Sequence, residues 1–433
     1  MMPGGTVRPT VTLPLAYVSA AALAFVLAAA AVPWLAPELA GHYYQPRILA
    51  LTHTVTLGWI TLTIMGASYQ LIPIVLARPL WSERLAWWQF GLMVVGIIGM
   101  IGHFFLGAWS GLVWAAALVA AGVGAHLVNL ARTMRGLAHW MFTARMVALA
   151  LAGLGVTTLV GFVLGLDKVL HVLPADRLFP HLHAHVHLAL LGWVLPMTIG
   201  VAARVYPMFL LAAEPAGWPG RAQLWGLAAG VPAIVVGICA SPVLLGAGAL
   251  AVTVAVAGHL VWLAAMVRSR RRPALDWGLR FVLTGAGALA LATALGLGLA
   301  LDLTGGPRVA LAYAALALGA WLSLTIAGML LKIVPFLVWY RVYAPRAGRA
   351  AVPTLADLSS PRAEGLAWLL LTLGTTSLPA GLWYGDPAWI RAAGLMVAAG
   401  AVVFGATLAR VLGHFRRRAT SVSRATAPVV RPA

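Results

Sequence analysis

The sequence predicts an all-α integral membrane protein with twelve transmembrane helices, arranged as three pseudo-symmetric units of four helices. Three observations predict this fold. Of the 433 residues, 62% are apolar and only 9% are charged, whereas a soluble domain has about 25% charged residues. Apolar runs recur along the whole chain, and each is long enough to cross about 30 Å of hydrocarbon. The pattern W-x6-G-x6-P occurs three times, starting at Trp59, Trp193 and Trp321.

Each expected span is a helix, because backbone groups in lipid must find hydrogen-bond partners within their own segment. The spans are expected at residues 13–35, 47–77, 86–107, 110–131, 145–166, 181–212, 222–240, 243–267, 278–301, 309–340, 364–382 and 391–412. They form one membrane domain, residues 1–418, with repeat units at about 13–131, 145–267 and 278–412. A disordered cytoplasmic tail is expected at 419–433.

The distribution of arginine and lysine predicts that both termini are cytoplasmic. The basic clusters follow spans four, eight, ten and twelve, which all end on one side of the membrane. The net charge of +19 therefore indicates topology and contact with the lipid bilayer, and no nucleic acid binding is expected. The expected location is a prokaryotic cytoplasmic (inner) membrane. The single cysteine, Cys239, excludes an internal disulfide framework and a Cys-based metal site.

Two of the three repeat copies carry a histidine at the same place. His53 lies six residues before Trp59, and His187 lies six residues before Trp193, whereas the third copy has Ala315. Because spans two, six and ten all enter from the outer side, His53 and His187 are expected at equal depth, as two axial ligands of one haem would be. Imidazole is a good ligand for iron and copper. A lone intramembrane histidine could simply hydrogen-bond a neighbouring helix, but a matched pair favours ligation.

Histidines alternate in the segment HLHAHVH at 181–187. Residues four apart share a helix face, and residues two apart point about 200° apart. His183 and His187 therefore share one face, and His181 and His185 share the opposite face, which fits two separate sites. His103 in span three lies at a compatible depth for either site. Alternatively, His181 and His183 are interfacial polar residues before the helix.

Other polar residues have simpler interpretations. Gln70, Arg204 and Lys332 each stand four residues after a repeat glycine. They either extend to the inner interface or meet haem propionates or an anionic substrate. The six remaining histidines are expected to be structural or at the surface: His42, His126, His139, His171, His259 and His414.

Two segments resemble a known superfamily. HVHLALLGW, with a glycine and a proline at seven-residue steps, resembles the HxHxxxLGW helix of subunit I in cbb-type haem–copper oxidases. HTVTLGWITLTIMGASYQLIP resembles a helix of bacterial nitric oxide reductases and cbb-type oxidases. Twelve helices with threefold pseudo-symmetry also match that superfamily, and the pattern is similar to the NnrS family of haem- and copper-containing membrane proteins. The detailed match covers spans two and six.

The resemblance implies a cofactor and a role for these histidines. His53 and His187 would bind haem b as its low-spin ligands. His185, with His181, His183 or His103, would bind copper or a second haem. The implied activity is that of an oxidoreductase related to terminal oxidases or nitric oxide reductases, with cytochrome c or quinol as electron donor and with partner subunits. The alternative is a non-enzymatic haem or copper sensor, carrier or assembly factor, as the likeness to NnrS suggests.

The sequence departs from the oxidase pattern at three places. The HxH helix is span ten in the oxidases and span six here. Span ten has Tyr313 and Ala315 at the equivalent positions. Span seven has no adjacent pair of histidines, which the oxidases use for copper.

Overall fold

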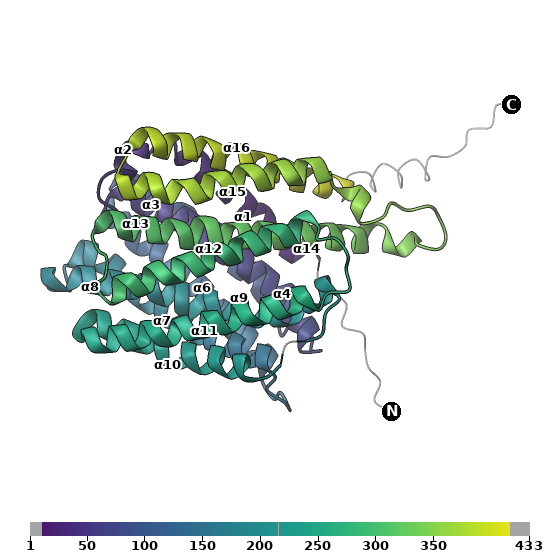
Figure 1. The fold of residues 1–433 in the computed structure, drawn as a ribbon, viewed down its shortest axis with the longest axis horizontal. Helices are drawn as coiled ribbons and strands as arrows, with labels where there is room; N and C mark the ends of the chain where they lie inside the picture. The colour runs from purple at the N-terminus through teal and green to yellow at the C-terminus, as the bar shows by residue number, and fades with distance from the viewer. Residues whose placement is uncertain (1–10, 215, 416–433) are drawn as a thin grey trace.

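The fold is a bundle of long helices (Figure 1). The structure is a computed structural model that describes residues 11–214 and 216–415. All regular secondary structure in these residues is helical, and twelve helical segments are long and apolar enough to cross a membrane. The expected twelve-helix membrane fold is confirmed. The tail expected at 419–433 lies outside the described residues.

The twelve spans follow one another with short connections. Spans one to four are α1 (Thr12–Ala31), α3–η1–α4 (Pro46–Val75), α5 (Glu83–Leu106) and η2–α6 (Trp109–Met134). Spans five to eight are α7 (Phe142–Leu170), η3–α8–η4–α9 (Ala175–Leu210), α10 (Trp218–Ala240) and α11 (Pro242–Arg268). Spans nine to twelve are α12 (Trp277–Ala300), α13–η5–α14 (Pro307–Val342), α15 (Pro361–Tyr384) and α16 (Pro387–Leu412). Span one ends at Ala31 instead of the expected residue 35, and a separate short helix, α2 (Ala36–Leu39), follows it.

Capping residues explain several span boundaries. The side chains of Ser82, Asp276 and Asp386 each accept a hydrogen bond from a backbone N–H in the first turn of α5, α12 and α16 respectively. Such caps satisfy donors that a helix leaves without partners at its start. Prolines stand at the first position of α11, α13, α15 and α16, where the missing N–H carries no penalty.

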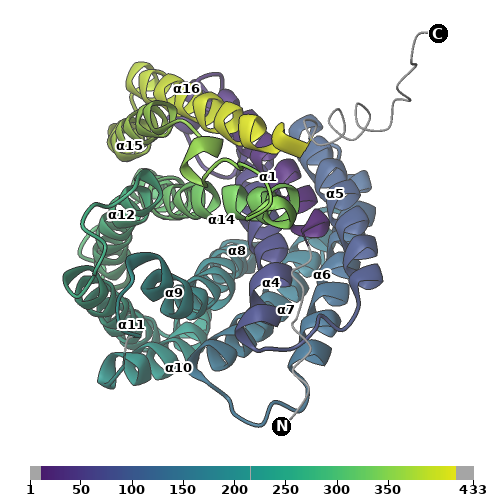
Figure 2. The same cartoon turned by 90° about the vertical axis from the view of Figure 1, so that its right-hand side faces the viewer.

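The three repeat-bearing spans lie near the centre of the bundle. Viewed end-on, α4, α9 and α14 lie towards the middle, and α5, α10, α11, α15 and α16 lie around them (Figure 2). Spans ten and six are the most buried of the twelve, at 67% and 61% of their most apolar windows. The indole Nε1–H of Trp59 donates to the Ser323 hydroxyl at 3.2 Å, which joins spans two and ten.

The repeat glycines allow close packing within each unit. Gly66, Gly200 and Gly328 face α1, α7 and α12, and each of these helices is the span that precedes the glycine's own span. A Cβ built on Gly66 would lie 2.4 Å from the Tyr17 Cβ, and one on Gly200 would lie 2.7 Å from the Met146 Cβ. Neither gap accepts a methyl group. The glycines therefore have the packing role that small residues have between membrane helices.

Candidate functional site

The repeat histidines stand at a local change of helix type. His53, His187 and Ala315 are each the last α-helical residue before a π-helical segment. π-Helical segments are rare in proteins overall, and those that occur are often at functional sites. This chain has one at the same place in each of the three repeat copies. The segments are η1 (Thr54–Thr61), η4 (Leu188–Val194) and η5 (Leu316–Ser323); they join α3 (Pro46–His53) to α4 (Leu62–Val75), α8 (Leu178–His187) to α9 (Leu195–Leu210), and α13 (Pro307–Ala315) to α14 (Leu324–Val342).

His53 and His187 are held in the same way. Nδ1 of His53 lies 2.8 Å from the Leu49 carbonyl oxygen, and Nδ1 of His187 lies 2.8 Å from the His183 carbonyl oxygen. A carbonyl oxygen can only accept, so each Nδ1 carries the proton and donates it. Each Nε2 then keeps its lone pair. This is the tautomer that metal-bound histidines adopt when their other nitrogen is anchored by the protein.

The two rings face different neighbours. His53 stacks on Phe104 of α5, with ring centroids 4.7 Å apart and an interplanar angle of 27°. His187 faces Tyr313 of α13, with centroids 6.1 Å apart and an angle of 19°. The two histidines therefore lie in separate parts of the bundle. His53 lies between spans two and three, and His187 lies between spans six and ten.

A cavity adjoins His187. His187 and Tyr313 both line it, and the other walls come from η4, α9, α10, α11, α12 and η5. Its volume is about 60 Å³, and one water needs about 10–15 Å³ on this measure. Apart from His187, Tyr313, Thr253 and Thr293, the lining side chains are apolar. The cavity accepts a diatomic molecule or a few waters without rearrangement, whereas a macrocycle would displace some of these apolar side chains.

The His185 ring has a different neighbour from both His53 and His187. Its Nδ1 lies 3.1 Å from the Thr157 carbonyl oxygen of α7, so this ring also keeps a free lone pair on Nε2. The ring fills the space left by Gly161, where a Cβ would lie 2.6 Å from the His185 Cε1. His185 therefore lies against span five, and it is not among the residues that line the Tyr313 cavity.

The other candidate ligands have separate partners. His181 donates from Nδ1 to a carbonyl of its own helical turn at 2.7 Å. Nε2 of His183 lies 2.8 Å from the Tyr43 hydroxyl, and burial raises the pKa of the Tyr43 phenol. Nε2 of His103 accepts from the Trp114 indole at 3.2 Å. Within residues 11–214 and 216–415, no three His, Cys, Asp or Glu side chains are grouped as metal ligands. The structure does not gather these histidines into one site.

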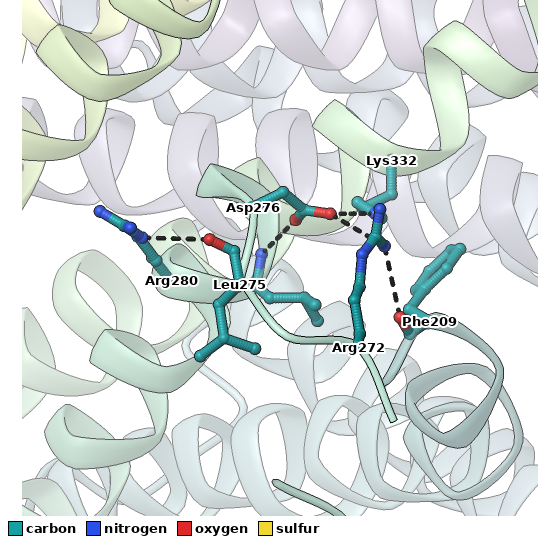
Figure 3. A network of polar contacts seen from close by, with 7 residues as sticks. Phe209, Arg272, Leu275, Asp276, Arg280 and Lys332 are labelled. Atoms are coloured by element: carbon teal, nitrogen blue, oxygen red, sulfur yellow. Dashed lines mark hydrogen bonds and ion pairs between the residues drawn. The ribbon is translucent and has the colours of Figure 1, made fainter. Parts of the chain in front are cut away.

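Lys332 belongs to an ion-pair network near the end of its span (Figure 3). Its ammonium group pairs with the Asp276 carboxylate, which also pairs with Arg272 at 3.2 Å. The Arg204 guanidinium pairs with Glu214 at an exposed position. Both cations therefore already have carboxylate partners, and the network joins the start of α12 to α14.

Gln70, the third residue of that set, is instead buried. It is 3% exposed, and neither atom of its side-chain amide has a hydrogen-bond partner. His126 of α6 is similar, because it is fully buried with no partner on either ring nitrogen. Its ring packs edge-on against Tyr69 at 5.0 Å. Gln70, Arg204 and Lys332 thus have three different environments rather than one shared site.

Sequence reasoning did not assign Tyr313 and Phe104 to the site. Tyr313 had a signal, since it stands two residues before Ala315 as His185 stands two residues before His187. Phe104 had none, because an aromatic residue in an apolar span is normally part of the packing. The backbone carbonyl of Thr157 also gives no sequence signal.

No family model matches the sequence, and no curated protein matches it.

Proposed function

We propose that this multi-pass membrane protein binds haem b, and that His53 and the HxH pair of span six, His185 and His187, supply axial ligands. The observation that carries the proposal is the matched setting of His53 and His187. Each donates from Nδ1 to the carbonyl oxygen four residues earlier, at 2.8 Å, and keeps Nε2 free. The resemblance to haem–copper oxidases favours His187 as the partner of His53, and copper or a second haem at His185.

The donor set suits haem iron. Anchoring Nδ1 on a carbonyl fixes the ring orientation and increases the basicity of Nε2. The span of His53 begins at Pro46, seven residues before the histidine. His53 therefore lies about 10 Å from the start of the helix, measured along its axis. Phe104 gives the ring an apolar, flat neighbour. Haem supplies one-electron chemistry and binds diatomic gases, whereas the chain positions the imidazoles and excludes water.

The proposed activity is electron transfer or the handling or reduction of nitric oxide or oxygen. A cytochrome c or a quinol would be the electron donor, and further subunits could carry it. The proposed setting is a prokaryotic inner membrane with both termini in the cytoplasm, which places His53 and His187 in the outer half of the bilayer.

A non-enzymatic role is the second candidate. The residues of span ten that correspond to the oxidase HxH pair are Tyr313 and Ala315, and span seven lacks an adjacent histidine pair. A chain with axial histidines and without these ligands fits a haem or copper sensor, carrier or assembly factor. Turnover of nitric oxide or oxygen with a reductant separates the two candidates.

An absorption spectrum with haem and metal assays tests the proposal. The full chain, purified after expression with a haem supply, is expected to contain non-covalent haem b with a six-coordinate low-spin spectrum. His53→Ala should remove that spectrum, and His139→Ala, at an exposed loop position, should not. A colourless protein would instead favour a transporter without cofactor.

A further inference from the structure

Tyr313 is the counterpart of His185 in the repeat. Each stands two residues before the position held by His187 in span six and by Ala315 in span ten. Each ring also fills the space beside a glycine on the first helix of its own unit. A Cβ on Gly161 of α7 would lie 2.6 Å from the His185 ring, and one on Gly296 of α12 would lie 3.0 Å from the Tyr313 ring.

The partner of Tyr313 is known from the geometry. Tyr313 of span ten faces His187 of span six at 6.1 Å, and both line one cavity. The pair has an equivalent one repeat copy earlier in the chain. In that copy, His185 of span six corresponds to Tyr313, and His53 of span two corresponds to His187.

The free nitrogens also agree. The Nδ1 atoms of His53 and His185 both donate to backbone carbonyls, so both Nε2 atoms keep lone pairs. His187 has a free Nε2 as well, but its ring neighbour is Tyr313. In the repeat pairing, the imidazoles that spans two and six offer to a metal between them are those of His53 and His185.

We infer that His185, rather than His187, is the axial ligand opposite His53, and that His187 and Tyr313 form a second, separate site between spans six and ten. This inference rests on the proposed haem function. It reverses the assignment that the HxH pair has in the resembling oxidase helix. The two sites are equivalent in the repeat, but only the first offers two imidazoles.

The test compares His185→Ala with His187→Ala in the full-length protein purified with haem. We expect His185→Ala to lose the six-coordinate low-spin spectrum and His187→Ala to keep it. Tyr313→Phe, which keeps the ring at the second site, should also keep it. Loss in His187→Ala with retention in His185→Ala would overturn the inference.

Methionine variants cover the case in which an alanine variant does not fold. His185→Met is expected to keep a six-coordinate haem with a raised reduction potential, since a His/Met pair raises the potential of haem iron. His187→Met should leave the potential unchanged, and the opposite result would overturn the inference. Failure of the proposed function looks different, because the unaltered protein would then lack haem or His53→Ala would keep the low-spin spectrum.

Discussion

His187 and Tyr313 face each other at 6.1 Å across spans six and ten, although the histidine was expected to pair with His53. The distance shows that span six directs the two histidines of its HxH pair to different neighbours. The His187 ring faces span ten, and the His185 ring lies against the Thr157 carbonyl of span five. Helical geometry requires this divergence, because residues two apart point in nearly opposite directions.

Adding a methyl group at Gly66 should destabilise the bundle. The new Cβ would lie 2.4 Å from the Tyr17 Cβ, so α4 and α1 would have to separate. Overpacking of this kind costs roughly 1–3 kcal/mol. Thermal unfolding in detergent should show a lower midpoint for Gly66→Ala. Gly91→Ala is the matched control, since nothing lies within 4 Å of its Cβ, and equal midpoints for both variants would contradict the packing account.

The ion pair at the start of α12 should contribute to stability. Asp276→Asn keeps a cap for the helix but leaves Lys332, whose side chain is only 15% exposed, without its carboxylate. Loss of a charged partner for a largely buried group costs about 1–3 kcal/mol. Asp176→Asn is the control, because its pair with Arg177 is exposed and such pairs contribute little. The same denaturation midpoint for the two variants would be evidence against the network.

His126 and Asn129 lie on the same helix and should respond oppositely to substitution. Both are fully buried. Asn129 exchanges two hydrogen bonds with the backbone of Ser82, at 2.8 and 3.1 Å, so Asn129→Leu should cost about 1–3 kcal/mol. His126 has no partner on either nitrogen, so His126→Leu should leave the unfolding midpoint unchanged or raise it. A large loss of stability in His126→Leu would show that the ring binds something essential.

Cysteine labelling should place the two ends of span ten on opposite sides, with the basic side inside. The background is Cys239→Ser, which removes the native thiol. A thiol introduced as Gly305→Cys should react with an impermeant reagent added outside, and one introduced as Ala350→Cys only after the membrane is opened. The reverse pattern would invert the proposed topology and move the site to the cytoplasmic half.

The sequence was sufficient for the twelve spans. Apolar length predicts twelve helices, and the repeat predicts that His53 and His187 occupy the same place in their spans; the shared π-helical boundary after each agrees. The partners of each ring were not predictable. Whether His53 meets His185 or His187 depends on the rotation of span six about its axis, and that rotation depends on packing against other spans, such as the close approach of Gly192 to Gly153. Phe104 and the Thr157 carbonyl come from other spans and carry no local signal.

A density map of the full-length protein purified with its native cofactors tests the central claim most directly. The expected result is a planar macrocycle between spans two and six, with Nε2 of His53 and of His185 bonded to the metal from opposite faces and His187 directed at Tyr313. A map with His187 rather than His185 opposite His53, or one in which neither His53 nor His185 contacts a cofactor, would contradict it.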